Sequence, residues 1–149
     1  MRNLEVKGLL SSSQPSLVTA ADTLFEVAAK LIEDPTTREV YVVDDVKRFI
    51  GVIPLRRLVR FVFASEVPGK HSATEMLELV SAECAGHLAL KKSAYVHSDH
   101  LLAHAVEVMF RFDLNEIPVV DADLVVVGCL NMLEILAAWH AGKLDEPAD

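Results

Sequence analysis

Apolar residues recur in two kinds of pattern along the chain, and each pattern predicts one type of element. The first repeats every three to four residues, as in a helix with one buried face. It predicts helices at 23–34, 54–64, 100–112 and 132–140. The second is a short run rich in β-branched residues, as in a buried strand. It predicts strands at 17–19, 39–43, 49–53, 95–97, 116–120 and 124–130.

The order of these expected elements occurs twice. The apolar stripe of the first helix begins at Leu24 and returns at Leu102, and the strand, glycine and second helix that follow return in the same order. The spacing between the copies shortens by a single position in the loop after the first helix, where length varies at little cost. The repeated stretches are Val40-Tyr41-Val42-Val43-Asp44 with Ile117-Pro118-Val119-Val120-Asp121, and Gly51 with Gly128. Self-similarity of this kind predicts an α+β chain built from two copies of a β-α-β-β-α unit.

Residues typical of helix ends support these limits. Thr23 and Glu26 have the spacing of a capping box, and Pro54 suits the first position of a helix, where its missing N–H is not needed. An extra helix is predicted over 72–83, for which the sequence indicates no function. The expected domains are repeat 1 at 1–66, an inter-repeat helix and linker at 67–86, repeat 2 at 87–142, and a frayed tail at 143–149.

Composition narrows the class of protein. The 149 residues are 52% hydrophobic with a mean hydropathy of +0.32, enough for a sizeable core and consistent with self-association. A net charge of −8 argues against nucleic acid as a partner, because binding it requires excess positive charge. No apolar run approaches the roughly 20 residues of a membrane span. The first residues show no signal-peptide pattern, so we expect a cytoplasmic protein without membrane insertion.

The duplicated pattern resembles a tandem pair of cystathionine-β-synthase (CBS) domains, a Bateman module, from about Val6 to Trp139. Besides the strands quoted above, the resemblance rests on two helix starts. They are Gly51-Val52-Ile53-Pro54-Leu55-Arg56-Arg57 and Gly128-Cys129-Leu130-Asn131-Met132-Leu133-Glu134. The resemblance implies two small sheets packed together and two clefts between the copies that hold adenosine nucleotides or related ligands. It also implies a homodimer of modules and a regulatory role toward an enzyme, channel or transporter.

In the family, the nucleotide-binding signature is Gly, two apolar residues, Ser or Thr, two variable residues, then Asp. Copy two has Asn131 at the hydroxyl position and Glu134 at the carboxylate position. A polar side chain and free N–H groups at a helix start suit a phosphate, and a carboxylate one turn later can accept both ribose hydroxyls. The resemblance adds His97 near the ligand and Ile117, Pro118 and Val119 against the adenine. The alternative is a reciprocal cap between Asn131 and Glu134 that needs no ligand.

Copy one departs further from the signature. Pro54 has no side-chain hydrogen bond to give, and Arg57 replaces the carboxylate, so this second cleft, which Thr19 and Tyr41 would also line, is not expected to hold a ribose in the family manner. A cation in the first turn of a helix is mildly unfavourable. We therefore expect Arg57 to have an anionic partner, with a neighbouring acid favoured over a phosphate.

One further cluster could carry chemistry. His100 and His104 are four residues apart and lie on one face of the expected helix, a spacing that can bind a divalent metal ion, although a solvated helix face is the favoured explanation. The sequence has no glycine-rich phosphate loop and no nucleophile elbow. We therefore expect no enzyme activity.

Two functions remain open at this stage. The first is a regulatory module that binds AMP, ADP, ATP or S-adenosylmethionine, chiefly at Asn131 and Glu134, and transmits this to a partner. The second is a ligand-free CBS scaffold for dimerisation or docking, which the losses at Pro54 and Arg57 favour. A metal-responsive module built on His100 and His104 is a third, weaker alternative.

Overall fold

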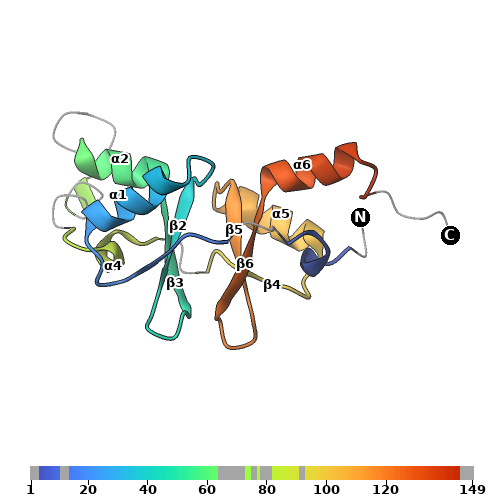
Figure 1. The fold of residues 1–149 in the computed structure, drawn as a ribbon, viewed down its shortest axis with the longest axis horizontal. Coiled ribbons are helices and arrows are strands. Elements are labelled where there is room, and N and C mark those ends of the chain that lie inside the picture. The colour runs from blue at the N-terminus through green and yellow to red at the C-terminus, as the bar shows by residue number, and fades with distance from the viewer. Residues whose placement is uncertain are drawn as a thin grey trace. The chain divides into compact units, whose positions relative to one another are not determined.

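The computed structural model describes residues 4–10, 14–63, 73, 74, 77, 82–90 and 93–144 (Figure 1). The chain forms two compact units. The copy-one unit contains Ser16–Val46 and Ile50–Lys92, and the copy-two unit contains Met1–Pro15, Lys47–Phe49 and Ser93–Asp149. Each unit has one three-stranded sheet, as the duplicated pattern predicts. Among the described residues, no helix is long and apolar enough to cross a membrane.

The copy-one unit is built on the sheet β1-β2-β3, in which β1 runs parallel to β2. Apolar residues of the sheet and of its helices form a single core, which includes Val27, Val42, Ile53, Leu58 and Leu88. Thr23 caps the first helix by accepting a hydrogen bond from the Glu26 N–H at 3.1 Å, as its position in the sequence predicts. The elements are β1 (Leu17–Thr19), α1 (Leu24–Glu33), β2 (Glu39–Val43), β3 (Phe49–Pro54), α2 (Leu55–Val62) and α4 (Ala85–Leu88).

The copy-two unit repeats this plan on the sheet β4-β5-β6, with β4 parallel to β5 and β5 antiparallel to β6. Its core includes Val6, Leu102, Met109, Ile117 and Leu130. The elements are the 3-10 helix η1 (Val6–Leu9), β4 (Val96–His97), α5 (Leu102–Arg111), β5 (Glu116–Val120), β6 (Val126–Asn131) and α6 (Met132–His140).

The segment that precedes each repeat belongs to the other repeat's unit. The Val6 N–H donates to the His100 carbonyl at 2.8 Å, and the Ala85 N–H donates to the Asp22 carbonyl at 2.8 Å. Asp22 and His100 occupy equivalent positions of the two repeats. The two short helices η1 and α4 therefore occupy equivalent positions, η1 in the copy-two unit and α4 in the copy-one unit. For this reason the compact units do not coincide with the contiguous repeats expected from the sequence.

Six of the ten expected helices and strands have bounds that differ by one or two residues from those observed. One of them is α5, which begins at Leu102, so that His100 lies in the turn before the helix rather than in it. The expected limit of the tail is also wrong. The last strand begins at Val126 rather than at Leu124, because Leu124 has a left-handed backbone with φ of 67° in a turn. The Asp121 carboxylate closes this turn by accepting the N–H of Asp123 at 2.8 Å and that of Val125 at 3.0 Å. The expected frayed tail is wrong at Leu144, which is only 8% exposed and packs in the copy-two core.

The extra helix expected over 72–83 lies mostly outside the described residues. Of the described residues in this range, Ala73, Thr74 and Leu77 are helical, whereas Ala82 and Glu83 are not, so the expected end of the helix at 83 is wrong.

Candidate functional site

The start of α6 lies beside one face of the copy-two sheet. On β5 and β6, Glu116 pairs with Asn131, and Pro118 pairs with Cys129. Paired residues on neighbouring strands point to the same face, and successive residues of a strand alternate between faces. Glu116, Pro118, Cys129 and Asn131 therefore share one face of the sheet, with Glu134 one turn into α6.

The opposite face of the same strands is buried in the core. Ile117, Val119 and Leu130 have no exposed surface and pack against residues of α5 and α6. Of the three residues expected against an adenine, only Pro118 therefore shares the face of Asn131. The side chains of Ile117 and Val119 are committed to the core, because three consecutive strand residues cannot face the same side.

Asn131 and Glu134 bind each other at the N-terminus of α6. The Asn131 Oδ1 accepts the Glu134 N–H at 2.7 Å, and the Asn131 Nδ2 donates to the Glu134 Oε1. The first helical N–H, that of Met132, donates to the Asn115 carbonyl at 2.9 Å. Both side chains of the pair are partly exposed. The reciprocal cap predicted as the alternative to a ligand site is therefore present, and a ligand would have to exchange with it.

The same end of the sheet carries a concentration of negative charge. Burial raises the pKa of the Cys129 thiol to about 12, and the charges of Glu116 and Glu134 act in the same direction. The thiol is therefore protonated at neutral pH and is not a nucleophile. Glu116 pairs with Asn131, and Glu134 lies one turn into α6, so both carboxylates belong to this end of the sheet.

His97 lies at the other end of this sheet. It pairs with Val120, whereas Asn131 pairs with Glu116. Four residues of β-strand separate these levels by about 13 Å. The structure therefore does not bring His97 together with Asn131 and Glu134 inside the copy-two unit.

His97 instead belongs to a row of three imidazole rings. Its ring meets that of His100 at a centroid distance of 5.0 Å, and the rings of His100 and His104 are 4.8 Å apart, all edge to face. Among the described residues, no three His, Cys, Asp or Glu side chains are placed to hold a metal ion.

The equivalent helix start in copy one has a different chemistry. Pro54 gives α2 no side-chain cap. The Arg57 side chain turns inward, is only 8% exposed, and its Nε donates to the Leu88 carbonyl at 2.7 Å. This carbonyl ends α4, so the cation faces the negative end of a short helix. The Leu88 carbonyl is thus one partner of the Arg57 cation, in the role that we expected of a neighbouring acidic side chain.

The other two residues expected at the second cleft are engaged as well. Tyr41 has no exposed surface. The Thr19 hydroxyl and the Thr19 N–H both donate to the Asp22 carboxylate at 2.9 Å, and these bonds hold the pKa of Asp22 below its usual value.

Sequence reasoning missed Glu116. A signal for it was available, because Glu39 begins the equivalent apolar strand of copy one. An acidic residue at the start of an apolar strand in both copies indicates a constrained position. Glu39 is only 2% exposed, whereas Glu116 is partly exposed.

A second surface feature of the copy-two unit is an apolar groove of about 330 Å³ between α5 and α6. Several of its side chains are well exposed, including Phe110 at 70% and Trp139 at 62%. The lining residues are Val106, Met109, Phe110, Met132, Ile135, Leu136, Trp139 and Leu144.

Comparison with known proteins shows what the chain resembles. The model of the CBS domain matches residues 6–64. A CBS-domain-containing protein from Thermotoga maritima is 30% identical and superimposes with a TM-score of 0.79, covering 97% of this chain and 100% of that one. No curated protein sequence matches the chain.

Two more distant structures share the fold. CBSX2 from Arabidopsis thaliana, solved in complex with AMP, is 18% identical with a TM-score of 0.74, covering 94% of this chain and 98% of that one. The CBS domain pair of protein MJ0100, solved with 5′-methylthioadenosine and S-adenosyl-L-methionine, is 18% identical with a TM-score of 0.72, covering 93% and 97%.

Proposed function

Since the chain belongs to the CBS-domain family and carries two CBS units in tandem, we propose that it is a regulatory module that binds an adenosine-type ligand at the start of α6. The observation that carries this proposal is the partly exposed pair of Asn131 and Glu134, at the signature positions of copy two and beside Glu116. The ligands bound by CBSX2 and by the MJ0100 pair support the choice of ligand class.

The pair offers what a ribose requires. A Glu134 carboxylate can accept hydrogen bonds from two neighbouring hydroxyls, and the Asn131 amide can both donate and accept. Binding would replace the side-chain bond between the two residues while the Asn131 Oδ1 keeps the Glu134 N–H. The helix cap and the ligand contact are thus compatible, because they use different atoms. Pro118 lies on the same face of the sheet but is itself buried, so a base could reach it only if this face opens.

Charge at this site favours some adenosine ligands over others. Glu116 and Glu134 both act on Cys129, so a phosphate bound close by would meet two like charges. Like charges a few ångströms apart cost free energy, and more so away from bulk water. We therefore expect S-adenosylmethionine, which carries a cationic sulfonium and an ammonium, to bind more tightly than AMP, ADP or ATP.

Calorimetric titration of the full chain tests the proposal. The ligands are S-adenosylmethionine, AMP, ADP and ATP, with neutral 5′-methylthioadenosine as the charge control. We expect heat with S-adenosylmethionine, less with 5′-methylthioadenosine and least with ATP. Absence of heat and of any thermal shift with all five at millimolar concentration would reject the adenosine function. Tighter binding of AMP than of 5′-methylthioadenosine would reject only the ranking by charge.

The ligand would act on a partner by differential affinity. A ligand shifts an equilibrium only when it binds one state of the protein better than another, and a partner that prefers the same state then binds more tightly. We propose an enzyme, channel or transporter as this partner. Pull-down of one such candidate with and without S-adenosylmethionine measures the coupling, and equal recovery in both samples would contradict it.

The groove between α5 and α6 favours a second function, that of a dimerisation scaffold. Its walls are almost wholly apolar, and Phe110 and Trp139 would lose their exposed surface in a dimer. The expected occupant is a second copy of this chain. If the module serves only as a scaffold and binds no ligand, the stability of this dimer does not depend on nucleotide. Light scattering should show a dimer at micromolar concentration that Leu136→Asp dissociates. Val127→Asp, at an exposed β6 position outside the groove, is the control. A wild-type monomer would overturn this function.

A further inference from the structure

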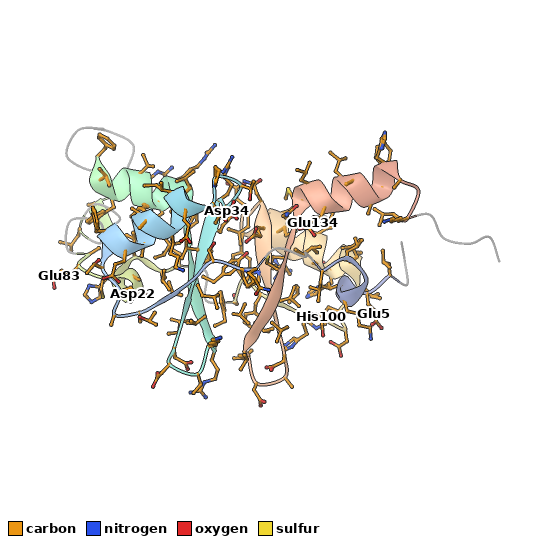
Figure 2. All side chains as sticks on the ribbon, in the orientation of Figure 1. Glu5, Asp22, Asp34, Glu83, His100 and Glu134 are labelled. Atoms are coloured by element: carbon orange, nitrogen blue, oxygen red, sulfur yellow. The ribbon has the colours of Figure 1, made fainter. Side chains whose placement is uncertain are left out.

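The turn before the first helix is closed in the same way in both units. In copy one, the Asp22 N–H donates to the Thr19 carbonyl at 3.1 Å, and the Thr19 N–H donates back to the Asp22 carboxylate at 2.9 Å. In copy two, the His100 N–H donates to the His97 carbonyl at 3.0 Å, and the His97 N–H donates back to the His100 Nδ1 at 3.2 Å. Thr19 is equivalent to His97 in the repeat, and Asp22 is equivalent to His100. An imidazole has therefore replaced a carboxylate as acceptor. Figure 2 labels the two acceptor residues, Asp22 and His100.

The two acceptors respond differently to acid. A carboxylate accepts hydrogen bonds at every pH above about 4. An imidazole nitrogen accepts a hydrogen bond only while it is unprotonated, and histidine ordinarily titrates at about pH 6.5. Once His100 is protonated, its Nδ1–H faces the His97 N–H, and two donors meet where one bond existed. The copy-two turn can therefore open in a pH range in which the copy-one turn stays closed.

The groups around His100 favour its neutral form. His97 on β4 and His104 on α5 pack edge to face against its ring. Burial and these two histidines hold the pKa of His100 below its usual value, while Asp99 in the turn acts in the opposite direction.

The elements packed on the turn add further charges. The charges that the N-terminal segment brings near the turn are Glu5 and Lys7, whose side chains pair with each other at 2.8 Å. The following helix α5 begins after Leu101, which supplies no side-chain cap. A cation just before a helix N-terminus is disfavoured by the helix dipole.

The N-terminal segment 4–10 depends on this turn. Its Val6 N–H donates to the His100 carbonyl at 2.8 Å, and its Lys7 N–H donates to the Ser98 carbonyl at 2.9 Å. Val6 has no exposed surface and shares the copy-two core with residues of α6. Leu10 lies against Gly128 of β6, where a Cβ atom would be 3.4 Å from the Leu10 side chain. The segment thus connects the turn to the strand and helix that carry Asn131.

We propose that the turn from His97 to His100 is a pH-sensitive latch for the N-terminal segment. Protonation of His100 breaks its bond with the His97 N–H, opens the turn and loosens segment 4–10 on the copy-two core. The Thr19–Asp22 turn has no such response in the same pH range. Since the folded chain binds this proton less readily than the unfolded chain, the stability contributed by His100 is complete above about pH 6.5 and is lost as the pH falls toward the folded-state pKa.

Amide hydrogen exchange of the full chain, followed by NMR, tests the latch, and the Thr19 amide serves as an internal control. We expect the protection of the His97, Val6 and Lys7 amides to fall between about pH 7.5 and about pH 5.5, by at most about tenfold per pH unit. The protection of Thr19 should stay constant over that range. In the same spectra, the nitrogen shifts of neutral His100 should report an unprotonated Nδ1.

Two variants separate the latch from general loss of structure. His100→Asn supplies an amide oxygen that does not titrate, and His100→Asp reproduces the copy-one turn. Both should keep His97 protected at the lower pH. Equal protection of His97 at both pH values in the wild type would overturn the proposal. So would an equal loss in His100→Asn, or a protonated Nδ1 in neutral His100.

Discussion

Removing the cap at the start of α6 distinguishes the two roles that Asn131 can have, which are capping the helix and binding a ligand. Asn131→Ala deletes both the acceptor of the Glu134 N–H at 2.7 Å and the donor to the Glu134 carboxylate. Loss of an Asn cap costs about 1 kcal/mol of stability. In a chain of this length that corresponds to a fall in Tm of about 2–4 °C. If the pair only caps the helix, this is the whole effect of the substitution.

The matched control is Thr23→Ala in copy one. Thr23 caps α1 through a single bond, with the Glu26 N–H at 3.1 Å, and its loss should also cost about 1 kcal/mol. Thr23 is not a signature position, so its removal should leave ligand binding unchanged. Glu134→Gln is the third variant. It keeps the backbone N–H that Asn131 accepts but removes the charge, and it should cost less stability than Asn131→Ala.

The assay is urea unfolding with and without S-adenosylmethionine. A ligand present at about a hundred times its Kd adds about 2.7 kcal/mol to the free energy of unfolding, which is well above the cap effect. We expect this increment in the wild type and in Thr23→Ala, and its loss in Asn131→Ala and Glu134→Gln. A full increment in Glu134→Gln would refute the assignment of that carboxylate to the ribose. Loss of the increment in Thr23→Ala would show that destabilisation alone abolishes binding.

Two further predictions concern the copy-one unit. Arg57→Met keeps the length of the side chain but removes the donor to the Leu88 carbonyl. Because bonds to charged groups contribute about 1.5–3 kcal/mol, urea unfolding should show a loss of that size, and an unchanged midpoint would contradict the buried bond. Gly51→Ala places a Cβ atom 2.9 Å from the Leu90 carbonyl oxygen, whereas Gly128→Ala makes only an ordinary contact at 3.4 Å. Gly51→Ala should therefore cost about 1–3 kcal/mol, and equal stability of the two variants would refute this reading.

Periodicity predicted the larger elements well because apolar stripes are redundant, so that several residues support each assignment. The bounds of β1, β2, β5 and α6 match the expected ones. The two short helices η1 and α4 were missed because four residues are too few to show a period. The left-handed turn at Leu124 was missed because the nearby Asp121 side chain stabilises it, which an apolar pattern does not register.

The candidate site was predicted less completely than the fold because its residues come together through strand register. The signature positions Asn131 and Glu134 were found from spacing within one segment. Glu116 begins the preceding strand and joins Asn131 only through the pairing of β5 with β6. The same register carries His97 to the far end of the sheet. A family signature transfers local spacing reliably, whereas neighbours from other strands require the register.

The duplication shows where the chain has changed its chemistry without changing its fold. The copy-one unit differs at two positions of the repeat. Its turn is held by Asp22, a carboxylate that does not titrate near neutral pH, and the start of α2 carries Arg57, which binds the Leu88 carbonyl and does not match the ribose-binding signature. The copy-two unit has His100 and Glu134 at those positions. A proton or an adenosine ligand would therefore change the free energy of one unit and leave the other as it was. A regulatory module requires such a difference, because a partner can respond only to an input that shifts some states of the protein relative to others.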